Sequence, residues 1–370
     1  MDPLVTLATL RPFSQSHIQG SGSRRSYIFR GSLQALSGEK LRSPSGKLRR
    51  WPAGALLALV AFVATGCAED APQDVLESLG NVSKKADSLW DITFLIAVIV
   101  FFLVEGALVY TLIKFRHKPG RRAEQFHGNT RLEVVLTVVP SLILAGLAVP
   151  SIKTVFELSE AAPSDALHVT VTARQFWWKY EYSDLGIVTA NELHIPTDKA
   201  VEVQVQGGDV IHSWWVPRLA GTIDAIPGRV NTITITADEP GRYMGQCKEF
   251  CGVSHANMRL IVYAHPQDEF DQWVEDQQQD ASATAPESFT QVCAACHAVK
   301  GTDAQADIGP DLTHFASRGT FAGAIFETNA ENLSQWLRDP PEMKPGSQMP
   351  DYNLSEEQIE ELVDYLLSLE

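Results

Sequence analysis

Three uninterrupted apolar stretches stand out in the first half of the chain. Residues 92–113 contain one charged residue, Glu105, and residues 132–152 also contain one, Glu133. At about 1.5 Å per residue, each of these two stretches is long enough to cross roughly 30 Å of hydrocarbon as a helix. We therefore predict two transmembrane helices. The third stretch, residues 53–66, is too short to span a bilayer comfortably.

Between about residues 165 and 265, apolar and polar positions alternate, which is the period of a β-strand. The alternation is clear in residues 167–172, 201–205 and 232–236, and residues 260–263 form a further short apolar run. Gly-Gly and Pro-Gly pairs separate these runs and supply the turns. Several short strands with regular turn signals predict a β-sandwich or a β-barrel.

The last part of the chain changes period again. Residues 273–287 are rich in Gln, Asp and Ala and have little to bury, so we expect a flexible linker. Within residues 288–370, the segment 355–358 (Ser-Glu-Glu-Gln) is a capping-box pattern. Apolar residues then recur at helical spacing from Ile359 to Leu367. We predict a separate small all-α domain here.

The distribution of charge orients these parts. The formal net charge is −15, which argues against a nucleic-acid binder that relies on bulk positive charge. Residues 1–50 nevertheless carry +7 and residues 114–131 carry +5. Because basic connectors stay on the cytoplasmic side, the second patch places the connector between the two helices in the cytoplasm. Everything after about residue 155 is then extracytoplasmic.

The short apolar stretch 53–66 has the pattern of a signal peptide. Arg49 and Arg50 precede it, and small residues end it immediately before Cys67. A cysteine at that position resembles a bacterial lipoprotein signal, which would make Cys67 the lipidated first residue. A plain signal sequence is the alternative.

Two of the five cysteines belong to a cluster of metal-ligating residue types. Cys247, Cys251, His255 and Met258 fall within 12 residues. Soft sulfur with imidazole favours copper or zinc, but a thioether ligand favours copper. Two thiolates can bridge two copper ions, and a second histidine, for which His212 is the best candidate, would come from another loop. A disulfide or a zinc site is the alternative, and we assign Met244, the rival thioether, to the core.

The other cysteine pair predicts covalent haem. Cys293-Ala294-Ala295-Cys296-His297 is a Cys-x-x-Cys-His motif, in which two thiols attach the haem and the histidine binds iron. A redox Cys-x-x-Cys pair is the alternative. The sixth iron ligand should be Met or His. We favour Met349, which precedes a proline as in small soluble cytochromes c, over Met343 and over His314, which we expect on the surface.

Residues 90–265 resemble subunit II of the haem–copper respiratory oxidases, the cytochrome c oxidase family. The matching segments are Arg131-Leu132-Glu133 with Pro140, the aromatic run Gln175 to Tyr182, His212-Ser213-Trp214, Asp224 to Arg229, and Cys247 to Met258. The resemblance implies a cupredoxin-like β-sandwich with a dinuclear copper centre, CuA. Its implied ligands are His212, Cys247, Cys251, His255, Met258 and the backbone carbonyl of Glu249. The Glu249 side chain would help to bind magnesium at the contact with subunit I.

The resemblance also implies roles for residues outside the copper ligands. The family's electron-entry tryptophan corresponds to Phe176 here, so Phe176, Trp177 and Trp178 are the candidates for electron entry. Glu133 matches an acid at the mouth of a proton-uptake pathway. In the C-terminal domain, Gly309 to Leu312 resemble the cytochrome c segment in which a proline, here Pro310, buttresses the iron-bound histidine.

These parts combine into one multidomain architecture. The expected regions are an N-terminal extension with a signal peptide (1–66), a transmembrane hairpin (67–155), a copper domain (160–272), the linker (273–287) and a cytochrome c domain (288–370). The combination resembles caa-type oxidases, located in a bacterial cell membrane. The subunit would accept electrons at haem c from cytochrome c or another donor. It would pass them through CuA to subunit I, where oxygen reduction drives proton translocation, in a complex that includes subunit III. The alternatives are the same subunit in a nitric oxide reductase and a freestanding membrane-anchored electron carrier.

Overall fold

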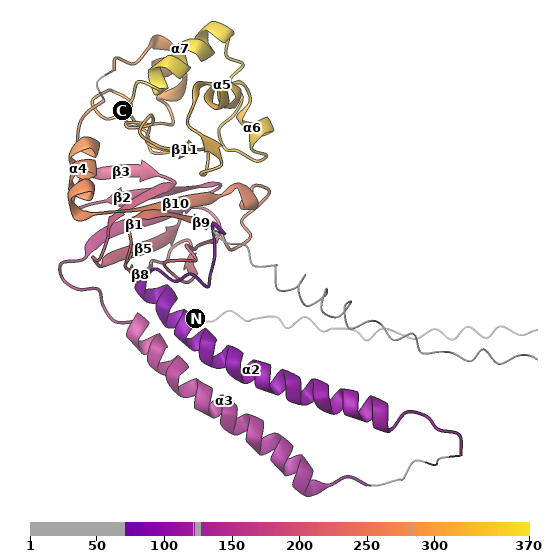
Figure 1. Ribbon diagram of the computed structural model, residues 1–370. Helices are drawn as coiled ribbons and strands as arrows, with labels where there is room; N and C mark the ends of the chain where they lie inside the picture. The colour runs from indigo at the N-terminus through magenta and orange to yellow at the C-terminus, as the bar shows by residue number, and fades with distance from the viewer. Residues whose placement is uncertain (1–70, 121, 123–126, 282) are drawn as a thin grey trace, which may run out of the picture. The chain divides into compact units, whose positions relative to one another are not determined.

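The computed structural model describes residues 71–120, 122, 127–281 and 283–370 (Figure 1). The expected signal peptide and Cys67 lie outside these ranges. The described chain contains a helical hairpin, a β-sandwich and a C-terminal domain, in the order expected from the changes of hydrophobic period.

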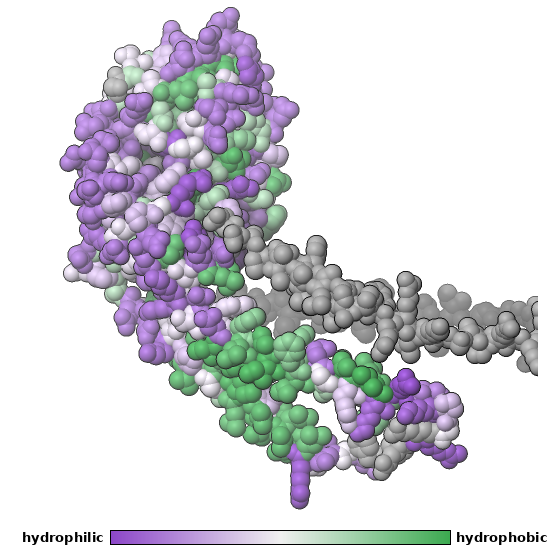
Figure 2. All heavy atoms as spheres, viewed as in Figure 1, coloured by the Kyte–Doolittle hydropathy of each residue, from purple (hydrophilic) through white to green (hydrophobic). Residues whose placement is uncertain are grey.

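Both apolar stretches form helices, and both helices are longer than predicted. Helix α2 spans Asn81–Lys114 and α3 spans Thr130–Leu158. Both are long and apolar enough to cross a membrane. Their apolar side chains are exposed, and Figure 2 shows the hydrophobic surface that they form. An ion pair of 2.9 Å between Lys85 Nζ and a Glu157 carboxylate oxygen joins α2 to the end of α3.

The extra length of α2 lies at its start, which is built into the β-sandwich. Val82 is 4% exposed and belongs to the core of the sandwich. The Asn81 side chain donates to the carbonyl of Thr234 at 3.0 Å and accepts from the Thr236 backbone N–H at 2.9 Å. The Ser83 hydroxyl donates to the carbonyl of Arg218 at 2.8 Å. The first turn of α2 is therefore attached by directed hydrogen bonds as well as by apolar burial.

The β-sandwich is built from two main sheets and a small ribbon. The larger sheet has five strands in the order β3-β2-β1-β5-β8, and the second has three in the order β4-β10-β9. The two-stranded ribbon pairs β6 with β7. The strands are β1 Leu167–Arg174, β2 Trp177–Tyr182, β3 Ile187–Ala190, β4 Glu192–Pro196, β5 Val201–Gly207, β6 His212–Trp214, β7 Ile223–Ala225, β8 Asn231–Ile235, β9 Gly241–Gln246 and β10 Arg259–His265.

Alternation along the strands fills the core between the sheets. Strand β1 pairs in parallel with β5, which places Val169 beside Val203 and Val171 beside Val205. All four side chains are almost completely buried. Their intervening neighbours point away from the core, as expected of strands with one buried face.

The expected linker needs a correction, because its first five residues are helical. Helix α4 spans Gln267–Gln277, and beyond it Ala281, Ala283 and Ala285 pack against the core of the C-terminal domain. The reason is a short apolar face. Phe270 is buried, Val274 packs against the sandwich core, and Trp273 stacks on the ring of His194 in β4 at a centroid distance of 4.4 Å. These contacts hold a helix whose other residues are polar.

The C-terminal domain has its own core, formed mainly by helices. It contains a turn of π-helix, η2 (Phe289–Cys293), then α5 (Ala330–Arg338), α6 (Pro340–Met343) and α7 (Glu356–Leu366). Two short strands, β11 (Thr320–Phe321) and β12 (Phe326–Glu327), also pair, which the all-α expectation did not include. The buried core is contributed by Phe289 and by the apolar faces of α5 and α7.

Helix α7 begins with the predicted capping box. The Gln358 backbone N–H donates to Ser355 Oγ, and the Ser355 backbone N–H donates to the Gln358 side chain at 2.9 Å. We predict that Ser355→Ala weakens the first turn by about 1 kcal/mol, which raises amide hydrogen exchange there about fivefold. Glu360→Ala, at an exposed mid-helix position, is the control and should leave exchange unchanged. Equal protection in both variants would show that the cap does not hold this turn.

Candidate copper and haem sites

Two loops of the β-sandwich bring the predicted copper ligands together. His212 opens β6, and the loop from Cys247 to Met258 joins the antiparallel strands β9 and β10. The loop is closed by a hydrogen bond of 2.8 Å from the Cys247 N–H to the Met258 carbonyl. His255 begins a single 3₁₀ turn within it. Residues that are 46 positions apart in the chain therefore face one centre.

The donor atoms form a continuous chain around the two sulfur atoms. The Sγ atoms of Cys247 and Cys251 are 3.8 Å apart. His212 Nδ1 lies 3.9 Å from the Cys247 sulfur, and His255 Nδ1 lies 3.7 Å from the Cys251 sulfur. The thioether sulfur of Met258 is 3.9 Å from Cys251 Sγ. Two sulfurs in the middle with one imidazole nitrogen on each side fit a copper site.

Asp209 orients the first imidazole. Its Oδ1 atom accepts from His212 Nε2 at 2.7 Å, while its other oxygen accepts from the Gln175 N–H at 2.6 Å. With Nε2 engaged, Nδ1 of His212 is turned toward the Cys247 sulfur. A carboxylate behind a ligating histidine fixes its tautomer and raises its basicity. Sequence reasoning missed Asp209, although an aspartate three residues before a candidate ligand on the same turn was a usable signal.

The two thiols respond differently to this environment. The hydrogen bond from Cys251, with help from His212 and backbone N–H groups, outweighs burial and lowers the pKa of Cys247 to about 4. The same contact with Cys247, together with burial, raises the pKa of Cys251. Burial lowers the pKa of His212, but its hydrogen bonds to Asp209 and Cys247 reverse the effect and leave it raised. A metal ion that binds both sulfurs therefore has one remaining thiol proton to displace.

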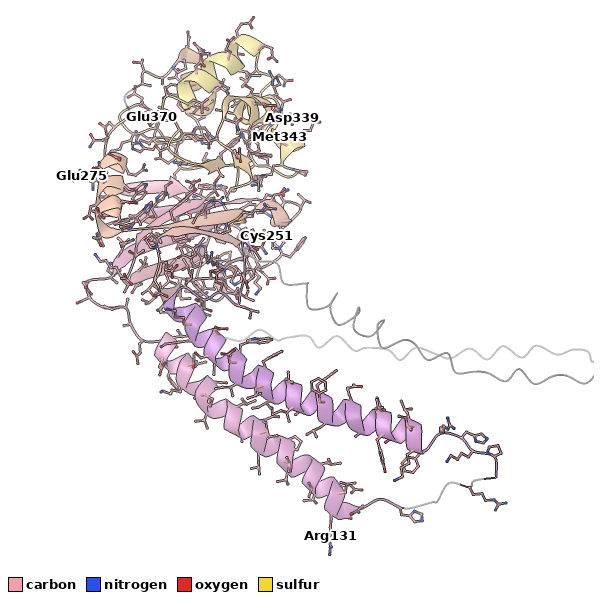
Figure 3. The ribbon with its side chains drawn as sticks, in the orientation of Figure 1. Arg131, Cys251, Glu275, Asp339, Met343 and Glu370 are labelled. Atoms are coloured by element: carbon pink, nitrogen blue, oxygen red, sulfur yellow. The ribbon has the colours of Figure 1, made fainter. Side chains whose placement is uncertain are left out.

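The other predicted residues of the copper loop also have clear positions. The backbone carbonyl oxygen of Glu249 lies 3.2 Å from Cys247 Sγ, and the Glu249 side chain is exposed. Met244 lies in β9, half-buried. Figure 3 labels Cys251, one of the two central sulfur residues, within the sandwich.

A mostly apolar cavity with about 1070 Å³ of empty space, partly open to solvent, surrounds the Cys-x-x-Cys-His motif. Its lining includes Cys293, Cys296, His297 and Met349. The cavity therefore brings together the predicted haem attachment residues and the preferred sixth ligand. Burial raises the pKa of the Cys293 thiol to about 11, so this cysteine is protonated at neutral pH.

The predicted iron-binding histidine is held in one orientation. His297 Nδ1 donates to the Pro310 carbonyl at 2.7 Å, which leaves Nε2 as the nitrogen with a free electron pair. Burial lowers the pKa of His297, so the ring is neutral at physiological pH. Gly309 lies against the ring, because a Cβ atom there would be only 2.6 Å from His297 Cε1. A neutral, fixed imidazole beside two cysteines in an apolar cavity fits haem c.

The rival sixth ligands lie elsewhere. Met343 ends α6 (Figure 3) and does not line the cavity, and neither does His314. The expectation that His314 lies on the surface was wrong. It is 5% exposed, and its Nε2 atom has no hydrogen-bond partner among the described residues. The loop that contains His314 packs inward beside Phe315, which belongs to the core of this domain.

The three aromatic candidates for electron entry separate by position. Phe176, in the turn between β1 and β2, and Trp177, the first residue of β2, line the haem cavity. Trp178 is fully buried in the sandwich, where its ring packs edge-on against His212 at a centroid distance of 6.1 Å. Phe176 and Trp177 therefore face the haem cavity, whereas Trp178 packs against a predicted copper ligand from inside the core.

Glu133, the predicted proton-uptake acid, lies in the first turn of α3, where it is exposed. The side chain of Asn129 caps this turn by accepting from the Leu132 N–H at 3.2 Å. Figure 3 shows Arg131 at the same end of α3. Glu133 and the basic connector thus share one end of the hairpin.

The fold and the two sites define a membrane-anchored redox protein, and comparisons with known proteins agree. The transmembrane domain of cytochrome c oxidase subunit II matches residues 77–154, the periplasmic domain of that subunit matches 186–265, and cytochrome c matches 282–370. Cytochrome c oxidase subunit 2 of Alkalihalophilus pseudofirmus is 36% identical, covering 85% of this chain and 95% of its own. The Bacillus subtilis subunit is 33% identical over 87% and 98%.

A solved structure covers one part of the chain. The periplasmic domain of subunit II of cytochrome oxidase from Bradyrhizobium japonicum is 34% identical, with a TM-score of 0.31, covering 32% of this chain and 97% of that one. On the relatives of nearly full length, the chain belongs to the cytochrome c oxidase subunit 2 family, as the resemblance implied. It is a haem–copper oxidase subunit with a cytochrome c domain in residues 282–370, and its two domains imply copper and haem c.

The role of Asp209 can be tested by copper affinity. We predict that Asp209→Ala lowers the affinity 10- to 100-fold, roughly the usual cost of removing a carboxylate behind a ligating histidine. Copper titration of the metal-free full chain measures the change. Asp184→Ala is a matched control, because Asp184 contacts another histidine, His168, at 3.3 Å outside the site. Unchanged affinity in Asp209→Ala would contradict the assigned role.

The close approach of Gly309 to His297 gives a second prediction. Gly309→Ala should displace the imidazole, because the new methyl group would lie within 2.9 Å of Nδ1 as well as 2.6 Å from Cε1. We expect loss of the low-spin haem spectrum, measured optically on the purified chain. Gly221→Ala is the control, since the nearest atom to its added Cβ is 4.0 Å away. A normal spectrum in Gly309→Ala would mean that the ring tolerates the methyl group.

Proposed function

We propose that this chain is the electron-entry subunit of a proton-translocating cytochrome c oxidase. Electrons arrive at a c-type haem, pass to a dinuclear CuA centre and leave for the haem and copper of subunit I, where oxygen is reduced. The observation that carries the proposal is the pair of sulfurs 3.8 Å apart, flanked by imidazole nitrogens at 3.9 and 3.7 Å. A cavity lined by the haem motif lies in the same compact unit.

These contacts support a ligand set for the copper centre. Cys247, Cys251, His212 and His255 would hold two copper ions. Met258 and the Glu249 carbonyl would supply the remaining, weaker ligands. Copper bound in this way supplies one-electron transfer. The protein's part is to hold all six groups on a β scaffold, so that the geometry changes little when an electron arrives. The exposed Glu249 side chain would bind magnesium at the subunit I contact.

The haem would be attached through Cys293 and Cys296, with His297 and Met349 as the axial ligands of its iron. The support is the cavity that all four residues line and the orientation of His297 by Pro310. Burial keeps the imidazole neutral and therefore able to bind iron.

Phe176 is our preferred aromatic group for transfer between the sites. A Cβ atom on Gly252, next to Cys251, would lie 3.0 Å from the Phe176 ring. A Cβ atom on Gly346, in the cytochrome c domain, would lie 3.3 Å from the same ring. The ring therefore touches backbone from both domains. Trp177 lines the same cavity and remains the second candidate.

The remaining parts of the proposal concern the membrane. The basic connector between α2 and α3 would lie in the cytoplasm, which leaves both redox domains extracytoplasmic in a bacterial cell membrane. Glu133, at the connector end of α3, would serve proton uptake into subunit I. Subunits I and III would be the partners, and cytochrome c or another donor would deliver electrons.

One preparation tests the proposal. The complex is extracted from membranes in detergent, and its copper, haem c, subunit composition and oxygen uptake are measured. Per copy of this chain, we expect one haem c and two copper ions in addition to the copper of subunit I, together with a haem-bearing partner subunit and oxygen consumption. A partner that reduces nitric oxide would assign the chain to a nitric oxide reductase. Copper and haem without any partner would make it a freestanding carrier.

The sixth iron ligand gives a separate prediction. Met349→Ala should abolish the low-spin spectrum of His/Met-ligated haem, because it removes the thioether that lines the cavity. Met343→Ala is the matched control and should retain the spectrum. The reverse pattern would make Met343 the ligand, and loss in neither variant would point to His314.

A further inference from the structure

Lys344 is a buried lysine at the junction of the copper domain and the cytochrome c domain. It follows α6, is 3% exposed, and lies five positions before Met349. Its Nζ atom donates to the carbonyl of Phe176 in the copper domain at 2.6 Å. It also donates to the carbonyl of Ala322 in its own domain at 2.6 Å. One amine therefore joins the turn that carries Phe176 to the cytochrome c domain.

The residues around Lys344 make the junction continuous. The Ser254 hydroxyl donates to the Pro345 carbonyl at 2.5 Å, and the Arg259 N–H donates to the Gly323 carbonyl at 2.9 Å. Ser254 immediately precedes His255, and Arg259 immediately follows Met258. The cytochrome c domain thus contacts the copper loop directly beside its ligands, without using a ligand itself.

Glycine at position 323 lets the chain approach this closely. Gly323 has φ +85°, a conformation that favours glycine, and a Cβ there would lie 2.5 Å from Lys344 Nζ and 2.9 Å from the Phe176 carbonyl oxygen. The backbone, the amine and the carbonyl are therefore packed without intervening space. Burying an amine without hydrogen-bond partners would be costly, so the burial of Lys344 depends on the two carbonyls that accept from it.

We propose that Lys344 is a positioning residue that holds the Met349 loop of the cytochrome c domain against Phe176 and the copper loop, and so maintains fast electron transfer between the two sites. The inference rests on the proposed function, because it assumes haem in the cavity and copper at the cysteines. It adds a residue that lines the haem cavity but is not a proposed ligand of either group.

The two hydrogen bonds do not require Lys344 to be charged. A neutral amine has two hydrogens, enough for both carbonyls, and an ammonium has three. Burial lowers the pKa of Lys344 to about 7, against the opposing effect of Cys251. The two hydrogen bonds of Lys344, which we call the clamp, therefore form in either protonation state. Their effect is on the geometry of the junction and not on its charge.

Lys344→Met in the full holo-complex tests the clamp. The variant keeps the length and apolar stem of the side chain but leaves two buried carbonyls without their donor. One electron is injected photochemically into the haem, and its arrival at copper is followed optically. We expect transfer about tenfold slower, which corresponds to about 1.4 kcal/mol of docking free energy. The haem and copper spectra should stay normal.

Lys300→Met is the matched control. Lys300 is in the same domain and also donates to a backbone carbonyl, that of Gln278 at 2.5 Å, but it does not contact the copper loop. We expect wild-type transfer in this variant. A readout that needs no redox group is amide hydrogen exchange at Arg259, whose N–H is bonded across the junction. Exchange there should rise in Lys344→Met and not in Lys300→Met.

The outcomes separate the two proposals. A wild-type complex without copper or haem c defeats the proposed function. Normal transfer and normal Arg259 exchange in Lys344→Met, with both centres present in the wild type, defeat the clamp alone. If Lys344→Met does not fold, Ser254→Ala removes the adjacent bond to Pro345 and decides in its place. Slower transfer with intact spectra supports the clamp, and unchanged transfer overturns it.

Discussion

The closure of the Cys247–Met258 loop by main-chain hydrogen bonds is the constraint on which the candidate copper site and its contact with the cytochrome c domain depend. The Cys247 N–H donates to Met258, the next residue's N–H donates to Ser213 at 3.0 Å, and the Gln246 N–H donates to Trp215 at 3.0 Å. Ser213 directly follows His212, so these bonds join the two ligand loops to each other. The predicted copper donors are therefore placed by backbone hydrogen bonds, and the cytochrome c domain contacts the same loop.

The close approach of β9 to the loop that follows β6 requires glycine at position 245. A Cβ atom on Gly245, in β9, would lie 2.4 Å from the carbonyl oxygen of Trp215. Any larger residue would separate β9 from the loop that follows β6 and move Cys247 away from His212. The positions of the sulfurs thus depend on a residue with no chemistry of its own, as well as on the apolar core behind them.

Sequence patterns predicted the features whose information is local. The spacing of the two cysteine motifs, the alternation in β1 and β5, and the capping box of α7 each lie within a short segment, and the structure contains all three elements. His212, expected from its place after a predicted strand, also lies with Cys247 and Cys251 in a group that could hold a metal ion. The family resemblance, which supplied the fold of the middle domain, is confirmed by the comparisons.

Features that depend on distant partners could not be predicted in this way. The helical start of the expected linker depends on the burial of Phe270 and on the packing of Trp273 and Val274 against the sandwich, and the burial of His314 depends on how its loop packs. Lys344 lies between two prolines and close to a glycine, a context typical of an exposed turn, yet it is buried because another domain covers it. In each case the deciding contact is with a residue far away in the chain, which no local period encodes.

The attachment of α2 to the sandwich affects how far the candidate copper site lies from the membrane. At about 1.5 Å per residue, the 34 residues of α2 are about 51 Å long, whereas the hydrocarbon core is about 30 Å thick. The part of α2 beyond the hydrocarbon core joins the sandwich without a flexible connection, because the first turn of the helix is hydrogen-bonded to β8 and its neighbours. A helix attached in this way would hold the sandwich at a fixed distance from the bilayer, without a hinge between them.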